Sequence, residues 1–341
     1  MGLKTEEFNY ELPERFIAQE PAKERDHSRL LIFDRQKSEL EHRRFFEIID
    51  YLNPGDLLVV NDTRVIPARF YARKLPGGGR VEILLLNKLD ESRWEALVGG
   101  SGMKLGRGFL IDNGPEGEVE EVLDGSRRNL KFAEALEPYF DQAGNTPLPP
   151  YIRNYVGDPE RYQTVYNQKP GSAAAPTAGL HFTPELLAKI EAKGVRIAKV
   201  ELRVGLDTFA PVTEENVEDH HIHKEWCQLN QQTAQEIRET KQRGGRVIAV
   251  GTTTVRTIES ACQASPTGEA QAFSGETELF ITPGYQFRCV DAIITNFHLP
   301  KSTLLMLVSA FASREQILHA YEVAKTEGYG FFSFGDAMLI L

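Results

Sequence analysis

The sequence has no long hydrophobic run: none of its apolar stretches approaches the roughly 18 residues that a membrane-spanning helix requires. The first residues, MGLKTEEFNY, also lack the basic start, the apolar segment and the small-residue cleavage site of a secretory signal. Both absences argue against a membrane or secreted protein. We therefore expect a protein that stays in the cytoplasm and does not bind a membrane.

Cysteine is scarce. Its three copies, Cys227, Cys262 and Cys289, are far apart and odd in number, so they form neither a disulfide framework nor a zinc ribbon. The chain also contains no HExxH motif, no GxGxxG fingerprint and no Walker lysine. We therefore expect free, mostly buried thiols, no bound metal and no resident cofactor.

Basic residues are outnumbered, with 39 Lys and Arg against 49 Asp and Glu and a net charge of −10. This balance argues against a general nucleic-acid coat protein, which needs clustered positive charge. Residues 64–107 are an exception, because nine basic residues stand there against four acidic ones. This segment is a candidate RNA-facing surface, and the alternative is a set of basic strand edges that oppose aggregation. The RNA-binding candidates within it are Arg64, Arg69, Arg73 and Lys74.

The order of the segments predicts an α/β protein with an insertion. Residues 30–62 suggest strand, helix and buried strand, and residues after 151 again alternate helices with strands. Between them, six short strand-like runs separated by Gly, Pro and Asp favour a small β-barrel, which ends at the stiff segment TPLPP. We expect a mostly parallel sheet flanked by helices, formed by residues 1–62 and 151–341, with an inserted barrel domain at 63–150.

A small-residue loop, GSAAAPTAG, stands directly before His181 and a helix expected to begin at Pro184. Small side chains let a ligand approach the backbone, and a helix N-terminus attracts an anionic group. Thr177 and Gly179 are the binding candidates in this loop. His181 is a candidate for proton transfer, and the alternative is a packing or capping histidine.

Polar residues also gather where the strand 195–204 is expected to end. Glu201, Arg203 and Asp207 lie near the carboxyl end of that strand, which is where open α/β sheets bind ligands. An ion pair between Glu201 and Arg203 that serves only the structure is the competing interpretation. His221 and His223 would share one face of a strand, and we prefer substrate contact or proton transfer to a metal site there, because no third ligand is evident.

Two further segments suggest a strand followed by a turn that holds polar side chains. In VGTTTVRTIES the candidates are Thr252, Thr253 and Arg256, where an anionic ligand group would meet a helix start. Simple helix capping would explain one of these threonines without a ligand. In TNFHLPKS the candidates are Asn296 and His298.

Together these segments resemble the S-adenosylmethionine:tRNA ribosyltransferase-isomerase family of queuosine biosynthesis. The resemblance runs almost from end to end. It rests on LPERFIAQEPA, GDLLVVNDTRVIPAR, LPPYI, GSAAAPTAGLHFT, VELRVGLDTFAPV, HKEW, VGTTTVRTIES, TNFHLPKSTLLMLVSAFA and GYGFFSFGDAMLI.

The resemblance implies a monomeric transferase that acts on tRNA carrying 7-aminomethyl-7-deazaguanine at the wobble position. The ribosyl group of S-adenosylmethionine, a co-substrate, would be transferred and isomerised to give epoxyqueuosine in tRNA, with release of adenine and methionine. In that case the basic candidates above would contact tRNA.

The implied reaction needs acids and bases. A base would remove a ribose C5′ proton acidified by the sulfonium, and adenine leaves more readily when protonated. The attacking amine must also lose a proton, because free alkylamines titrate near ~10. We expect these groups among His181, Glu201, Asp207, His221 and His223. Arg203 or Arg256 would hold the methionine carboxylate, and a cation–π contact with the sulfonium would come from Phe182, Phe209 or Trp226.

Two other functions stay open at this point. A tRNA methyltransferase would use the same donor, although the glycine-rich loop expected after its first strand is not seen. A non-catalytic RNA-binding protein would use the barrel alone, as small barrels do. The acidic balance and the polar residues at strand ends count against that second alternative.

Overall fold

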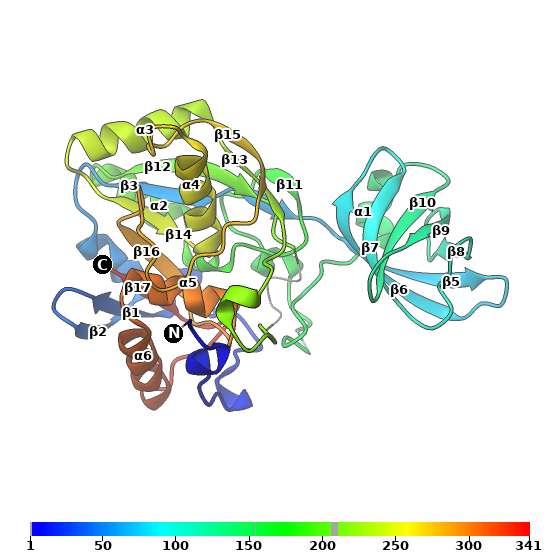
Figure 1. Ribbon diagram of the computed structural model, residues 1–341, viewed down its shortest axis with the longest axis horizontal. Coiled ribbons are helices and arrows are strands. Elements are labelled where there is room, and N and C mark those ends of the chain that lie inside the picture. The colour runs from blue at the N-terminus through cyan, green and yellow to red at the C-terminus, as the bar shows by residue number, and fades with distance from the viewer. Residues whose placement is uncertain (1, 154, 206–210) are drawn as a thin grey trace. The chain divides into compact units, whose positions relative to one another are not determined.

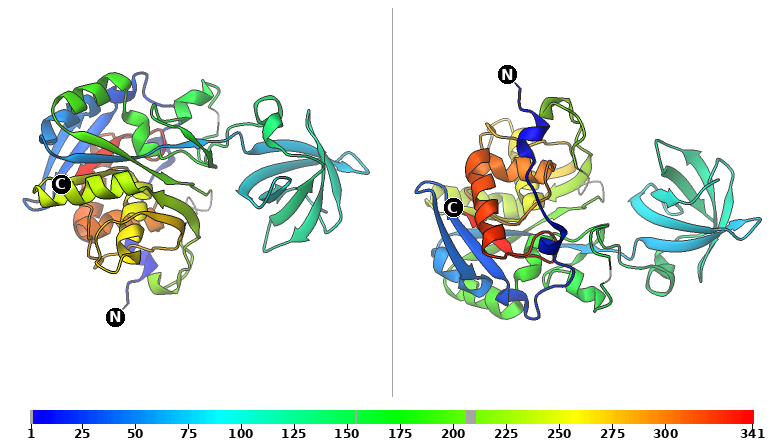
Figure 2. Two further views of the ribbon diagram at one scale, coloured as in Figure 1. Left: turned by 90° about the horizontal axis from the view of Figure 1, so that it is seen from above. Right: turned by 90° about the horizontal axis from the view of Figure 1, so that it is seen from below.

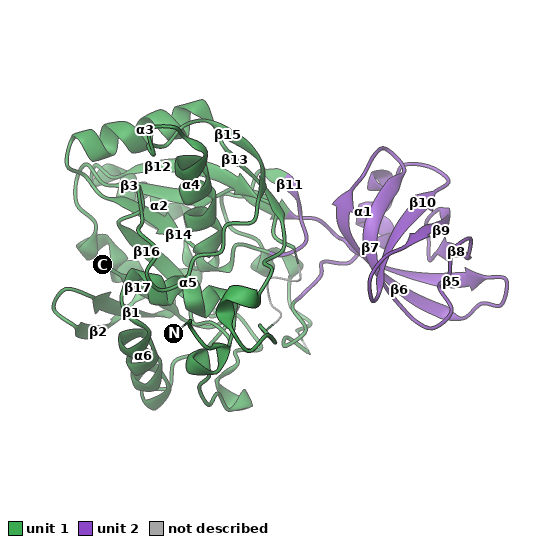
Figure 3. Cartoon of the chain, viewed as in Figure 1, with its two compact units in different colours: residues 1–64, 149–169, 175–341 green, residues 65–148, 170–174 purple. Residues whose placement is uncertain are grey.

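The computed structural model describes residues 2–153, 155–205 and 211–341. The chain divides into two compact units, shown in Figure 3. The first unit comprises residues 1–64, 149–169 and 175–341, and the second comprises residues 65–148 and 170–174. The ranges expected from the sequence differ from these by a few residues at each boundary and by the segment 170–174.

The first unit is built around a nine-stranded mixed sheet, seen in Figure 1, in the order β15-β13-β12-β3-β14-β16-β17-β1-β2. Strands β12, β3, β14 and β16 run parallel in its centre, and β17 pairs with β16 in the antiparallel direction. The strands are β1 Arg29–Asp34, β2 Glu39–Arg44, β3 Leu57–Asn61, β12 Arg196–Leu202, β13 Glu225–Leu229, β14 Val247–Val250, β15 Phe273–Thr277, β16 Ala292–Asn296 and β17 Ala337–Ile340.

Both faces of this sheet are apolar, because the central strands are continuous runs of branched hydrophobic residues. Successive side chains of a strand point to opposite faces. Leu57 and Val59 of β3 therefore belong to one hydrophobic cluster, and Leu58 and Val60 belong to the other. A sheet that is apolar on two faces needs a cover on each.

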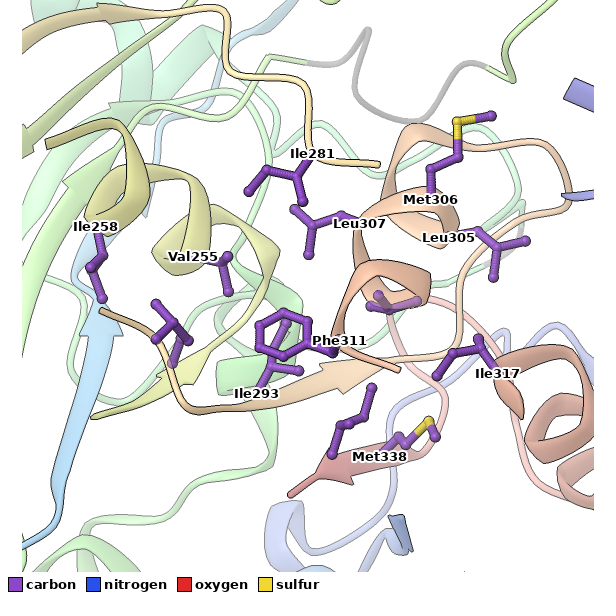
Figure 4. Packing of buried hydrophobic residues seen from close by; sticks show 14 of the residues in the cluster. Val255, Ile258, Ile281, Ile293, Leu305, Met306, Leu307, Phe311, Ile317 and Met338 are labelled. Atoms are coloured by element: carbon purple, nitrogen blue, oxygen red, sulfur yellow. The ribbon is translucent and has the colours of Figure 1, made fainter. Parts of the chain in front are cut away.

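Helices supply both covers, as the views in Figure 2 show. Helices α3 to α6 pack on one face, and Figure 4 shows side chains of α4 and α5 converging on Ile293 of β16. Helix α2 and the 3₁₀ helix Phe45–Tyr51 pack on the other face. The helices are α1 Phe140–Ala143, α2 Pro184–Ala192, α3 Gln231–Gln242, α4 Thr252–Ala264, α5 Thr303–Phe311 and α6 Arg314–Thr326.

The start and end of α2 follow directly from the sequence. The Thr183 hydroxyl accepts a hydrogen bond from the Leu186 N–H at 3.1 Å, and Pro184 occupies the first helical position. Gly194, with a φ of +91°, ends the segment in the left-handed region that glycine tolerates.

The second unit contains a closed six-stranded antiparallel barrel in the order β10-β7-β6-β5-β8-β9. In β5 the side chains of Phe70 and Ala72 are buried, whereas Tyr71 and Arg73 are exposed. The barrel strands are β5 Arg69–Leu75, β6 Arg80–Lys88, β7 Arg93–Gly99, β8 Gly108–Ile111, β9 Glu116–Val122 and β10 Arg127–Phe132, and a two-stranded sheet is formed by β4 Thr63–Val65 and β11 Lys169–Ser172.

The predicted fold class, an α/β sheet flanked by helices with a small β-barrel, is confirmed. The helix predicted after the first strand is present at residues 45–51 as a 3₁₀ helix. Strand β2 was missed because its side chains are mostly exposed and polar. One local prediction was wrong. His221 and His223 precede β13 instead of lying in a strand. In the part of the chain that the structure describes, no helix has both the length and the apolar character needed to cross a membrane.

Candidate active site

A cavity opens at the carboxyl ends of the central parallel strands. β3 comes first in the chain, β12 pairs on one side of it, and β14 and β16 follow on the other side, so the chain order reverses between β3 and β14. Such a switch point is where open α/β sheets bind ligands. The strand-end cavity, as we call it, is lined by Tyr151, Ala175, Pro176, Thr177, Ala178, Val204, Gly251, Thr252, Thr253, Thr295, Asn296, Phe297, His298, Leu299, Ser302, Leu304, Phe332 and Ser333.

The N-terminus of α4 reaches the strand-end cavity. Gly251, which precedes the helix, has a φ of +87° and provides no side-chain cap for the first N–H groups. The hydroxyl of Thr254 donates to the Val250 carbonyl at 2.7 Å, but the buried Oγ1 of Thr253 has no partner among the described residues. Because buried hydroxyls are normally hydrogen-bonded, Thr253 is a candidate for direct contact with a ligand.

The described residues that line the strand-end cavity include no Asp, Glu, Lys or Arg. Hydroxyls, one amide and one imidazole supply its polarity. Phe332, which also lines it, has a φ of +70°, a conformation that non-glycine residues hold only where the surrounding structure enforces it. The cavity therefore suits a neutral group with an apolar face and a few hydrogen-bonding atoms.

His181 is buried behind this cavity in a chain of hydrogen bonds. The Asn296 amide donates to His181 Nε2 at 3.2 Å, so Nδ1 carries the proton and donates to Ser28 Oγ at 2.7 Å. The Thr177 hydroxyl donates to Asn296 Oδ1 at 2.9 Å. Burial, with help from Arg25, lowers the pKa of His181 to about 3. His181 is therefore a neutral imidazole that orients Asn296 and Thr177 at the cavity wall.

His298 lies at the cavity itself. Its Nε2 is 2.7 Å from Thr295 Oγ1, and its backbone N–H donates to the Tyr321 hydroxyl at 3.0 Å. Burial lowers the pKa of His298 to about 3, so this ring is also neutral at physiological pH. It offers a substrate a hydrogen-bonding nitrogen and carries no charge.

Glu201, near the end of β12, is buried between two cations. Its carboxylate lies 3.0 Å from Arg203 Nε and 3.2 Å from Lys169 Nζ. The guanidinium of Arg203 lies over the Trp226 ring, 4.3 Å from its centroid, so that this aromatic face is already covered by a cation. Glu201 and Arg203 thus form an ion pair at the carboxyl end of β12, outside the lining of the strand-end cavity. Asp207 and Phe209 lie outside the described residues.

A second cavity adjoins the first and shares Leu304 with it. Arg256 and Glu225 form a buried ion pair in its wall, and the exposed His223 stands nearby. His221 is exposed and is not part of either lining. The arginine cavity, as we call it, is lined by His220, Ile222, His223, Glu225, Arg256, Leu279, Phe280, Ile281, Thr303, Leu304 and Leu307.

Two of the predicted binding residues lie in packed regions of the first unit. A side chain at Gly179 would overlap the Tyr166 hydroxyl, so close packing explains why a glycine occupies this position. Phe182 is fully buried and packs edge-on against Phe45, with ring centroids 4.9 Å apart. The structure thus brings five predicted binding residues to the strand-end cavity and leaves Gly179, Phe182, Arg203 and Arg256 outside it; those five are Thr177, Thr252, Thr253, Asn296 and His298.

The four predicted RNA-binding residues do not form one continuous group. Arg64 belongs to the first unit, where it contacts Glu160 at 2.5 Å and Asn167 at 2.7 Å. Arg69 and Arg73 share the outer face of β5, but Lys74 follows Arg73 directly and points to the other side. Arg73 is the most exposed of the three arginines and contacts Asp112 at 3.3 Å.

Asp62 is a residue that the sequence interpretation missed. It follows β3 directly, is buried, and its Oδ1 has no hydrogen-bond partner among the described residues. Burial raises the pKa of its carboxyl, although Lys169 and Lys199 oppose that effect. A charged residue at the end of a fully buried strand was the signal that pointed to it.

Tyr151 and Ser333 were also missed. The Tyr151 hydroxyl lies 2.7 Å from Ser333 Oγ at the wall of the strand-end cavity. Both residues come from loops without a helix or strand pattern, so the sequence offered no periodic signal for them. Within the described ranges, the one group of side chains with metal-ligand spacing is Glu24, Asp26 and His27, which lies apart from both cavities.

The chain is similar to known proteins over nearly its whole length. The model of a family described as queuosine biosynthesis protein matches residues 5–340. A protein of Clostridioides difficile named S-adenosylmethionine:tRNA ribosyltransferase-isomerase is 51% identical over 342 residues, which cover 99% of this chain and 100% of that protein. A protein of Thermotoga maritima with the same name is 51% identical over 340 residues, with the same coverage.

A solved structure supports the same correspondence. The crystal structure of an S-adenosylmethionine tRNA ribosyltransferase from Thermotoga maritima is 42% identical in sequence and has a TM-score of 0.57. The match covers 98% of this chain and 100% of that one. The similarity therefore extends across both units.

Proposed function

Because the chain belongs to the family of queuosine biosynthesis proteins, we propose that it transfers the ribosyl group of S-adenosylmethionine onto a tRNA and isomerises it. It is an enzyme of the tRNA ribosyltransferase-isomerase class. The tRNA substrate carries 7-aminomethyl-7-deazaguanine at the wobble position, and the products are epoxyqueuosine in tRNA, adenine and methionine. The protein acts in the cytoplasm as a monomer, with S-adenosylmethionine as co-substrate.

The observation that carries this proposal is the match to relatives that are 51% identical in sequence, which covers 99% of this chain and 100% of each relative. The strand-end cavity supports it independently. Its uncharged lining, at the switch point of the sheet, suits the adenosyl part of the donor. Hydroxyls at the start of α4 and the imidazole of His298 offer hydrogen bonds to the purine or to the ribose.

One proton leaves ribose C5′ next to the sulfonium, and the electron pair left on C5′ breaks the C4′–O bond of the ring. The freed ring oxygen becomes the carbonyl oxygen of C1′ as the C1′–N bond to adenine breaks, and adenine takes up a proton. The amine of the tRNA base then loses a proton as its nitrogen bonds to C4′, and the electron pair returned to C5′ forms a bond to C1′. The oxygen on C1′ finally displaces methionine from C5′ to close the epoxide, and methionine leaves with the sulfur electron pair. Burial lowers the pKa of both nearby imidazoles, His181 and His298, to about 3, which makes them weak bases. We assign these proton transfers to members of the group Glu201, Asp207, His221 and His223, of which His223 lines the arginine cavity.

His181 has a positioning role in this scheme. Its two ring nitrogens hold Ser28 and Asn296, and Asn296 in turn holds the Thr177 hydroxyl. His181→Asn should therefore weaken binding of the donor more than it slows turnover at saturating donor. A large fall in turnover number with an unchanged KM would instead indicate that His181 itself moves a proton.

The tRNA contact is assigned to the predicted basic residues, and Arg73 is the most exposed of the three arginines among them. Arg73→Glu should weaken tRNA binding and reduce its dependence on salt. Lys74→Glu is the matched control, because Lys74 follows in the same strand but points to the other side. Equal effects of both changes, or no effect of either, would count against a binding face on β5.

Release of adenine tests the function directly. S-adenosylmethionine and tRNA bearing the aminomethyl-deazaguanine are incubated with the protein, with unmodified tRNA as the control, and free adenine is measured by chromatography. Release with the modified tRNA alone is expected. S-adenosylhomocysteine in place of adenine would identify a methyltransferase, and tight tRNA binding without any product would identify an RNA-binding protein.

A further inference from the structure

The arginine cavity combines aliphatic walls with one buried ion pair. Leu279, Ile281, Leu304 and Leu307 provide apolar surface, and Arg256 contributes from the second turn of α4. This lining is unlike that of the strand-end cavity, which has no charged residue among those described. A ligand that reaches both cavities across Leu304 must therefore be neutral at one end and charged at the other.

The hydrogen bonds of Arg256 are incomplete. Its side chain is only 5% exposed. Its Nε donates to the Leu279 carbonyl at 3.2 Å, and its Nη1 pairs with the Glu225 carboxylate. Its buried Nη2 has no hydrogen-bond partner among the described residues. Buried guanidinium groups are normally saturated with acceptors, since each donor removed from water without a partner costs free energy.

Glu225 brings the opposite charge to the same place. It begins β13, its side chain is 4% exposed, and its Oε1 accepts the Gly205 N–H at 3.0 Å. One cation and one anion side by side match the two charges of an α-amino acid, whose carboxylate and ammonium group stand on one carbon. The other titratable groups at this cavity are His220, which pairs with Glu214 at 3.0 Å, and the exposed His223.

We propose that the arginine cavity binds the α-amino-acid end of the ribosyl donor, with Arg256 Nη2 holding its carboxylate and Glu225 facing its ammonium group. This inference rests on the proposed function, because that function makes S-adenosylmethionine the donor. The methylene groups of the donor lie against the leucine and isoleucine side chains. The adenosyl part lies in the strand-end cavity, and the sulfonium lies near Leu304, which lines both cavities.

Three ligands separate the two ends of the donor in a calorimetric titration of the full chain. S-adenosylmethionine has both ends, its decarboxylated form lacks only the carboxylate, and 5′-methylthioadenosine lacks the whole amino acid. The unaltered protein should bind S-adenosylmethionine roughly 10- to 100-fold more tightly than the decarboxylated form, as expected for a hydrogen bond between two charged groups. Equal affinities for these two ligands would overturn the proposal, whatever any variant does.

Arg256→Lys keeps the charge but removes the planar fork of donors. It should weaken the binding of S-adenosylmethionine roughly tenfold or more and leave the affinity for 5′-methylthioadenosine unchanged. Arg246→Lys is the matched control, because Arg246 pairs with Asp56 through Nε and Nη2 at the other end of β14. If Arg256→Lys weakened both ligands equally, its role would be structural and the proposal would fall. If the unaltered protein bound neither ligand, the proposed function would fall as well.

Discussion

Thr253 and Thr254 are neighbours at the start of α4, and exchanging each for valine should change stability in opposite directions. Valine has nearly the shape of threonine and a similar helix propensity, so the hydroxyl is the main difference. Thr254 Oγ1 donates to the Val250 carbonyl at 2.7 Å, whereas the buried Oγ1 of Thr253 has no partner among the described residues.

The magnitudes follow from these hydrogen bonds. A typical intramolecular hydrogen bond contributes about 1 kcal/mol net, so Thr254→Val should lower the free energy of unfolding by about 1 kcal/mol. A buried hydroxyl without a partner costs about 1 kcal/mol or more, so Thr253→Val should raise the free energy of unfolding by about 1 kcal/mol. The same change should weaken binding of S-adenosylmethionine about 3- to 10-fold, because the hydroxyl reserved for the ligand is gone.

Urea unfolding of the ligand-free protein, followed by tryptophan fluorescence, measures the stability change, and calorimetry measures donor binding. A loss of stability in Thr253→Val comparable to that in Thr254→Val would refute the reasoning, since both hydroxyls would then be equally satisfied in the folded state. A gain in stability with unchanged donor affinity would also refute it, because it would leave the unpartnered hydroxyl without a ligand to contact.

Three other outcomes follow from buried groups. His298 keeps a pKa of about 3 when folded, below its ordinary value of 6.5, so the stability it contributes is present above pH 6.5 and is lost as the pH falls toward 3. When the pH is lowered from about 7.5 to about 5.5, the unfolding free energy of His298→Gln should therefore fall by about 1.4 kcal/mol less than that of the unaltered protein. Urea unfolding measures this difference, and an equal fall in both proteins would contradict the assignment. Asp56→Asn should cost about 3 kcal/mol in urea unfolding, because it leaves the Arg246 guanidinium without its carboxylate, and a loss below about 1 kcal/mol would speak against the pair. Gly179→Ala should lower stability by about 2 kcal/mol through overlap with the Tyr166 hydroxyl, and thermal unfolding should show part of that loss restored by adding Tyr166→Phe.

The parts of the fold that were predictable are those in which burial leaves a regular pattern. The barrel strand Arg69–Leu75 alternates between buried and exposed side chains, and β3 is a continuous buried run. The edge strand Glu39–Arg44 has no such pattern, because its side chains are mostly exposed, and hydrogen bonding to β1 alone makes it a strand. The 3₁₀ helix at Phe45–Tyr51 buries Phe45 and Ile48 as an α-helix would, so periodicity could not distinguish the two.

Prediction of the site residues from sequence was limited in a different way. Motifs singled out Thr177, Thr252 and Asn296 as binding candidates, and the structure places all three in the lining of one cavity, because parallel strands bring their carboxyl ends to one edge of the sheet. Whether a polar residue faces a ligand or another side chain depends on partners distant in the chain. Ser28 meets His181 across 153 positions and makes it a positioning group, which no local pattern in GSAAAPTAGLHFT indicates. An unpartnered buried donor or acceptor is thus a better guide to ligand contact than residue type, and only coordinates reveal it.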